Sequence, residues 1–147
     1  MGAFLAIYVR VPVNVDLSVC LARYGEAFGE PNSEFRGIVL SPLQYDGSAP
    51  DDLEAVSAEL NTDVLLLGFC GITNRFLFHH WRAGRRLRAL EYLGMDTKYE
   101  WDLDEGEPEP WEPESFGALR AGRLVQDIEA HGAAELAAEF YRLPGWS

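Results

Sequence analysis

The sequence predicts an α+β fold, with an antiparallel or mixed sheet of about five to six strands, two helices on one face and a helical C-terminal tail. Residues 64–93 contain three strand-like segments in succession, separated by breaks too short for a parallel return. Residues 17–28 and 53–60 carry apolar side chains at helical spacing. We therefore expect these two helices to pack on the sheet, and the 147 residues to form a single domain.

The first third of the chain alternates between strand and helix. Residues 3–13 are rich in β-branched and aromatic side chains, which indicates a first strand, and residues 35–40 indicate a second. Between them a helix is expected over 17–28, with Asn14 or Asp16 as its cap. The apolar positions of this helix are Leu17, Leu21, Tyr24 and Phe28.

A second helix is expected to begin at Ser48–Asp51 and to end at Asn61. The serine hydroxyl, the proline and the acids of this start suit the first turn of a helix, where backbone amides are free and the dipole is positive. Its inward positions are Leu53, Val56 and Leu60.

Three central strands follow, over residues 64–71, 75–82 and 85–93. The first of them is nearly all apolar, so it suits the middle of a sheet that is covered on both sides, with Leu66 in the core. Ala83–Gly84 separates the other two. Such a short connection is typical of a hairpin.

A two-residue turn at Ala83–Gly84 would pair Trp81 with Arg86 and His79 with Arg88. One face of the hairpin would then carry the side chains His79, Trp81, Arg86, Arg88 and Tyr92 toward solvent or a pocket. The opposite face would pair His80 with Leu87, Phe78 with Ala89 and Phe76 with Glu91. A bulge at Gly84 would shift this register, and the sequence leaves that alternative open.

The composition changes after Gly94. Residues 91–114 contain ten acids and one base, so we expect an acidic loop over about 94–116, in which 98–103 form a strand. Residues 106–113 include three prolines and predict a stiff, extended segment. Glu107 and Glu109 are expected to be exposed loop charges whose removal changes stability little.

The helical tail is predicted over about 117–143. Apolar spacing indicates one helix over 118–130 and another over 133–143, and His131–Gly132 would divide them. The inward positions of the second helix are Leu136, Phe140 and Leu143.

Composition excludes several classes of function. With 24 acids against 12 bases and a net charge of -12, the chain is unsuited to bind nucleic acid or an anionic membrane surface. Two cysteines cannot form a disulfide scaffold, which indicates the reducing cytoplasm. The apolar runs are shorter than the ~20 residues of a membrane span, and no secretory leader is recognisable.

The candidate ligand or partner site is a patch of arginine and aromatic side chains, made of His79, Trp81, Arg86, Arg88, Tyr92 and Trp111. One interpretation is recognition of an anion or an acidic partner by the arginines. The other, which we favour, is that they balance the acidic loop of the same chain. Trp111, between two prolines, is either an anchor on the loop or folds back to cover the sheet.

No catalytic, cofactor or metal site is predicted. The sequence contains no phosphate-binding glycine loop, no nucleophile elbow and no paired-cysteine or paired-histidine metal motif. His79 and His80 are neighbours in a strand and point to opposite faces, so they cannot serve one metal together.

Residues 81–92, Trp101 and residues 106–112 resemble small uncharacterised bacterial domains that carry an arginine-rich hairpin and a Pro-Trp-Glu loop. The resemblance covers about 40 residues. It implies a bacterial, non-secreted protein, and it implies no activity.

Three functions follow as hypotheses. The first is a non-enzymatic protein-binding module, such as an acidic inhibitor or immunity-type protein whose carboxylates 100–114 shield the basic site of a nuclease or similar toxin. The second is a small-anion-binding protein or enzyme that uses His79, Arg86, Arg88 and Tyr92. The third is a homo-oligomer subunit joined through Trp111 or a sheet edge.

Overall fold

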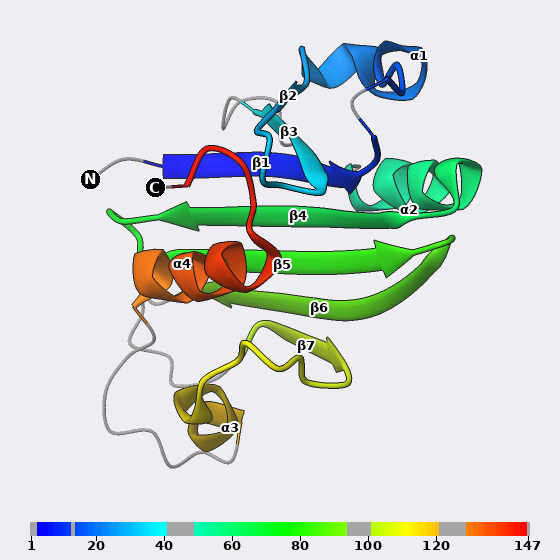
Figure 1. Cartoon of the computed structure of the whole chain (residues 1–147). Coiled ribbons are helices and arrows are strands. Elements are labelled where there is room, and N and C mark those ends of the chain that lie inside the picture. Colours follow the sequence, from blue (N-terminus) through cyan, green and yellow to red (C-terminus); the bar gives the residue numbers. More distant parts are fainter. Residues whose placement is uncertain (1–2, 13, 41–48, 94–100, 121–128, 147) are drawn as a thin grey trace.

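The computed structural model describes residues 3–12, 14–40, 49–93, 101–120 and 129–146, and it confirms the α+β class. Within these residues, seven strands form one antiparallel sheet and helices lie on both of its faces (Figure 1). The strands are β1 (Ala3–Arg10), β2 (Phe28–Gly29), β3 (Phe35–Val39), β4 (Asp63–Cys70), β5 (Arg75–Arg82), β6 (Arg85–Leu93) and β7 (Leu103–Gly106). The helices are α1 (Ser18–Leu21), the 3-10 turn η1 (Ala22–Tyr24), α2 (Ala49–Leu60), α3 (Glu114–Arg120) and α4 (Ala130–Tyr141).

The sheet has the strand order β2-β3-β1-β4-β5-β6-β7, with β4 in the middle. The predicted run of three adjacent antiparallel strands over 64–93 is therefore confirmed as β4, β5 and β6. Side chains of a strand alternate between faces, so the apolar run of β4 supplies both sides of the sheet. Leu66 packs in the core of one face and Leu67 in that of the other, and both are fully buried.

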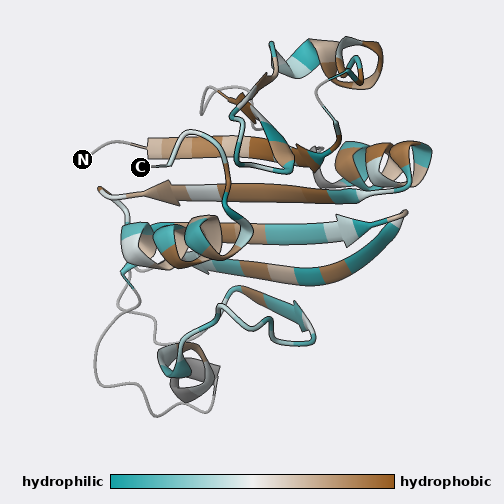
Figure 2. Ribbon diagram, in the orientation of Figure 1, coloured by the Kyte–Doolittle hydropathy of each residue, from teal (hydrophilic) through white to brown (hydrophobic). Residues whose placement is uncertain are grey.

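Each face of the sheet has its own core. On one face α1, η1 and α2 bury the expected apolar positions against the strands, namely Leu17, Leu21, Tyr24, Leu53 and Val56. On the other face lie α4 and three residues of the 101–116 segment, the buried Trp111 and Phe116 and the partly buried Trp101. Figure 2 shows the apolar colouring along β4, as expected for a strand covered from both sides. The predicted five to six strands and two helices differ in detail from the structure, because the sheet has seven strands and this face carries α1, η1 and α2. The C-terminal helix α4 covers the opposite face.

The helix expected over 17–28 is shorter than its apolar spacing indicated. The helical turns end at Tyr24, because Gly25 has a φ of 127° that no helix contains. The chain then runs extended, and Phe28 lies in β2 beside Gly37 of β3. Phe28 is therefore a strand residue, not the last apolar position of a helix.

The C-terminal helix begins earlier than expected. His131–Gly132 lies in the first turn of α4, where the Glu129 side chain caps the helix by accepting hydrogen bonds from both backbone amides. The expected division at these residues is thus wrong. The helix start at Ser48, the strand beginning at residue 98 and most of the helix over 118–130 fall on residues outside the described ranges. In the described part of the expected 98–103 strand, Trp101 and Asp102 lie outside any strand, and β7 begins only at Leu103.

In the described part of the chain, no helix combines the length and the apolar character that crossing a membrane requires. The longest helices there, α2 and α4, have 12 residues each, against about 20 for a span.

Candidate functional site

The β5–β6 hairpin turns at Ala83–Gly84 as expected, and both residues adopt the positive φ that such tight turns require. The expected register is nevertheless wrong beyond the first pairs. Leu87 is an extra residue of β6, a bulge, so every later residue of that strand is displaced by one. The pairs are Trp81–Arg86, His80–Arg88, His79–Ala89, Phe78–Leu90, Leu77–Glu91 and Phe76–Tyr92.

This bulge divides the predicted patch between the two faces of the sheet. Cross-strand partners share a face, so His79, Trp81 and Arg86 lie on the side of α2. Arg88, Tyr92 and Trp111 lie on the opposite side, with α4. The structure therefore brings the six residues together only as two separate groups of three.

Arg88 is the charged residue of the second group, and its side chain is 0% exposed. Its Nε and Nη2 donate to the two carboxylate oxygens of Glu112, at 2.7 and 2.6 Å. Its Nη1 donates to Asp104 at 2.7 Å and to the carbonyl oxygens of Glu105 and Gly106. Burial lowers the pKa of Arg88, but the bonds to Glu112 and Asp104 outweigh it and raise the pKa overall. All three nitrogens of the guanidinium therefore donate to acceptors of the same chain.

The basic residues of the first group, His79 and Arg86, also pair with acids of the same chain. Nε2 of His79 lies 2.8 Å from Glu91, and this bond lowers the pKa of the Glu91 carboxyl. The ring of His79 stacks on Trp81, with centroids 5.4 Å apart. Arg86 forms an ion pair with Glu105. The hairpin bases in both groups are thus matched by acids of the same chain.

Trp111 folds back onto the sheet, which is one of the two interpretations that its position between prolines allowed. It is 7% exposed and its ring meets Phe78 edge-on, with centroids 4.9 Å apart. Phe116 packs beside it. Its indole Nε1 donates to Glu109 at 2.9 Å. Trp111 therefore fixes the proline-rich segment in place.

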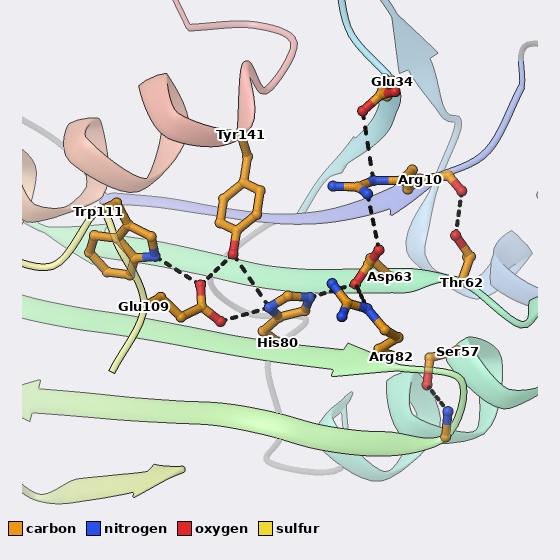
Figure 3. Close-up of polar contacts among 11 residues, drawn as sticks. Arg10, Glu34, Ser57, Thr62, Asp63, His80, Arg82, Glu109, Trp111 and Tyr141 are labelled. Carbon is orange, nitrogen blue, oxygen red and sulfur yellow. Dashed lines mark hydrogen bonds and ion pairs between the residues drawn. The ribbon is translucent and has the colours of Figure 1, made fainter. Parts of the chain in front are cut away.

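The structure adds a polar cluster that the sequence did not reveal, centred on His80 (Figure 3). Nδ1 of His80 lies 2.7 Å from Glu109, and Nε2 lies 2.7 Å from Asp63. The hydroxyl of Tyr141 donates to the other carboxylate oxygen of Glu109. The cluster joins β4, β5, the proline-rich segment and the end of α4, and both His80 and Asp63 are buried.

Asp63 connects this cluster to two arginines. Nε of Arg82 donates to it at 2.8 Å, and Arg10 of β1 reaches its other oxygen at 3.3 Å. Arg10 in turn lies 4.0 Å from Glu34. Burial raises the pKa of Asp63, but the bonds from His80 and Arg82 outweigh it and lower the pKa overall.

The hydrogen bonds of the cluster link segments that are far apart in the sequence. Burial raises the pKa of Glu109, but its bonds from His80 and Tyr141 outweigh that effect and lower it. Both ring nitrogens of His80 are engaged by carboxylate oxygens, Nδ1 by Glu109 and Nε2 by Asp63. Burial and the neighbouring Glu109 raise the pKa of Tyr141, which keeps its hydroxyl protonated. Neither ring nitrogen of His80 is left without a carboxylate partner.

Glu109 corrects the expectation of exposed, dispensable loop charges. Its side chain is 11% exposed and bonds to His80, Trp111 and Tyr141, whereas Glu107 is exposed. The available signal was the spacing Glu109-Pro110-Trp111, which places an acid beside an aromatic residue that folds back. Its partner His80 lies 29 residues away in sequence, so only the fold identifies the pair.

No protein-family model matches the chain, and no similar protein is found among curated sequences or among solved structures. The described residues thus define an α+β fold with a buried ionic cluster, and function has to be inferred from that geometry.

Proposed function

We propose that this chain is a non-enzymatic protein-binding module with a basic protein as its partner, of the acidic inhibitor or immunity type. We place it in the bacterial cytoplasm. The support for this function is the net charge of the chain, together with which charged side chains pair internally and which are exposed.

The observation that carries the proposal is the internal pairing of the hairpin bases. Arg88 is enclosed by Glu112 and Asp104, Arg86 pairs with Glu105, and His79 pairs with Glu91. These bases are engaged within the chain, while the net charge is -12. The excess negative charge is therefore carried by acids elsewhere on the surface.

Several of those acids are exposed on helices. Asp51, Glu54 and Glu59 lie on the outer side of α2, and Glu135 and Glu139 lie on that of α4. A surface of one sign attracts a partner of the other sign and accelerates their association. This supports a basic partner rather than an acidic one.

The acids to which we attribute the attraction differ from carboxylates 100–114, which the sequence suggested. Within 101–114, Asp104, Glu105, Glu109 and Glu112 bond to bases of the same chain. They are not available to shield a basic site. We therefore assign the attraction of the partner to the exposed acids of the helices, not to carboxylates 100–114 as a group.

The internal pairing also argues against the alternative of a small-anion-binding protein or enzyme on the hairpin. An anion at Arg88 would have to displace Glu112, whose side chain is 4% exposed, and leave that carboxylate buried without its cation. Such an exchange is unfavourable by several kcal/mol. The saturated bonds of His80 further support a role without catalysis.

Capture from the native lysate tests the proposal. The immobilised chain should retain a basic protein at low salt and release it at high salt, because salt screens exposed charges. The purified partner should bind one to one, with an association rate that falls steeply as ionic strength rises. Replacing Asp51, Glu54 and Glu59 by their amides should slow association, whereas Val19→Ser with Ile72→Ser, at exposed apolar positions, should not. Recovery of no basic protein at low salt would exclude the proposal.

A further inference from the structure

The C-terminal helix α4 has an unusual distribution of side chains. Its buried face is made of alanines, namely Ala130, Ala133, Ala134, Ala137 and Ala138. Its large apolar side chains point outward instead, with Leu136 40% and Phe140 49% exposed. Small side chains let the helix approach the sheet closely, so the expected inward positions Leu136 and Phe140 are wrong. Two large apolar residues one turn apart form a patch, which scattered single residues do not.

An acidic row runs beside this apolar pair. Glu135 and Glu139 are one turn apart and exposed, and the helical repeat places each next to Leu136 or Phe140 on the outer surface. Among the ion pairs of the described residues, Glu135 contacts His131 at 3.4 Å, and none involves Glu139. The outer face of α4 thus combines apolar surface with negative charge.

A hollow of about 370 Å³ lies on the other side of the acidic row. Its apolar lining comes from Ala138, Leu143 and Trp146, and Glu135, Glu139 and Arg142 line it with charge. Two acids against one base leave it net negative. This combination suits a lysine or arginine side chain, whose aliphatic stem packs on apolar surface while its charged head reaches an acid.

We propose that the outer face of α4, with its adjoining hollow, is the docking surface for a basic amphipathic segment of the partner protein. This inference rests on the proposed function and specifies where the basic partner binds. Arginine or lysine side chains of the segment pair with Glu135 and Glu139, and one of them enters the hollow. Apolar side chains of the segment cover Leu136 and Phe140.

The helix that carries this face is anchored at both ends and packed against the sheet. The alanine side of α4 is buried against β4 and β5, and the Tyr141 hydroxyl ties the end of the helix to Glu109 of the His80 cluster. Glu129 fixes the start of the helix. A surface that is already ordered loses little conformational entropy on binding, which favours affinity. The buried cluster therefore serves the docking face by holding its helix in place.

An NMR titration tests this proposal with a defined probe, an amphipathic helical peptide of leucine and arginine. The intact, isotope-labelled chain should show shift changes concentrated in α4 and residues 142–146. The variant Leu136→Ser with Phe140→Ser should weaken binding by about tenfold. The matched variant Val19→Ser with Ile72→Ser, which removes apolar side chains that are 80% and 85% exposed, should leave it unchanged. A peptide of arginine and serine with equal charge should bind more weakly than the probe.

Dispersed amide spectra of both variants establish that they fold. Equal binding of the two peptides would overturn the docking surface, because charge alone would then explain the affinity. Shift changes confined to the acids of α2 would also overturn it and would leave the proposed function standing. Absence of binding by the probe and of any basic protein in lysate capture would overturn both. Self-association that the Leu136→Ser, Phe140→Ser variant abolishes would assign the face to a second copy of the chain instead.

Discussion

Glu109 Oε2 lies 2.7 Å from Nδ1 of His80, so a carboxylate of the acidic segment is hydrogen-bonded to the interior of the sheet. The ring's other nitrogen meets Asp63 at 2.7 Å. Two acids from distant segments therefore share one imidazole ring, and the hydrogen bond to that ring lowers the pKa of each carboxyl. The acidic segment is part of the folded core at this point, although its composition resembles a solvated loop.

The two glutamates on either side of Pro108 should differ in their effect on stability. Glu109→Gln disrupts the hydrogen bonds of a mostly buried carboxylate with His80, Trp111 and Tyr141, so the free energy of unfolding should fall by about 1–3 kcal/mol. Glu107→Gln changes an exposed side chain and should leave the free energy of unfolding the same within error. Urea denaturation of both variants measures the difference. Equal effects of the two changes would show that the Glu109–His80 bond contributes nothing.

Arg88 should be among the most sensitive positions of the chain. Arg88→Leu leaves Glu112 and Asp104 enclosed without their cation, and breaking such a pair typically costs about 3–5 kcal/mol. The neighbouring Arg85 is exposed, so Arg85→Leu is the matched control. Arg88→Lys should also destabilise, because an ammonium group cannot serve both oxygens of Glu112 and Asp104 in the same geometry. Thermal melts that ranked Arg85→Leu as the more damaging change would contradict the assignment.

The parts of the fold that the sequence predicted are those with local signals. The helix over 49–60 and the strands over 64–93 follow from apolar spacing and from short breaks such as Ala83–Gly84, which act within a few residues. Leu66 is buried for the same reason, since it stands in an apolar run bounded by turns.

The site could not be predicted in the same way because its determinants are not local. The bulge at Leu87 depends on how β6 fits both β5 and β7, and nothing in the run of residues around it marks the extra position. That single residue moves Arg88 from the face of His79 to the face of His80. The orientation of α4 also depends on close packing, because its alanines pack against the sheet and Leu136 is left on the outer side.

Acid should unfold the chain through its paired carboxyls. Asp63, Glu91 and Glu109 have pKa values lowered from 3.8 for aspartate and 4.5 for glutamate. As the pH falls past these ordinary values, the unfolded chain takes up protons first, so stability that is present at neutral pH is lost. Urea midpoints should therefore decline below pH 4.5 and continue to decline through the lowered folded-state values. The Glu109→Gln variant should show a shallower decline, and an identical pH profile would contradict the role of Glu109.

At alkaline pH, the stability of the fold should depend on the Tyr8 hydroxyl. Burial is the main reason that the pKa of Tyr8 is raised from 10.0 to about 12, although the Trp146 indole donates to its hydroxyl. The unfolded chain loses this proton first, so the contribution is present below pH 10.0 and is lost as the pH rises toward about 12. Tyr8→Phe should flatten this alkaline decline in the urea midpoint. Absorbance titration of wild type that showed every tyrosine ionising near pH 10 would contradict the buried state of Tyr8.

Gly106 should be required for the bulge and for the enclosure of Arg88. Its φ is +89°, and a Cβ there would lie 2.0 Å from the carbonyl oxygen of Leu87, which is rigid backbone. Gly106→Ala should therefore cost about 1–3 kcal/mol from the backbone conformation alone, and more from the contact. Gly117 in α3 is the matched control, because a Cβ there meets no atom within 4 Å and alanine favours a helix. Denaturant melts should place Gly106→Ala well below wild type and Gly117→Ala at or slightly above it. A Gly106→Ala variant as stable as wild type would mean that β7 does not approach the Leu87 bulge so closely, and the acceptors that enclose Arg88 would then need another explanation.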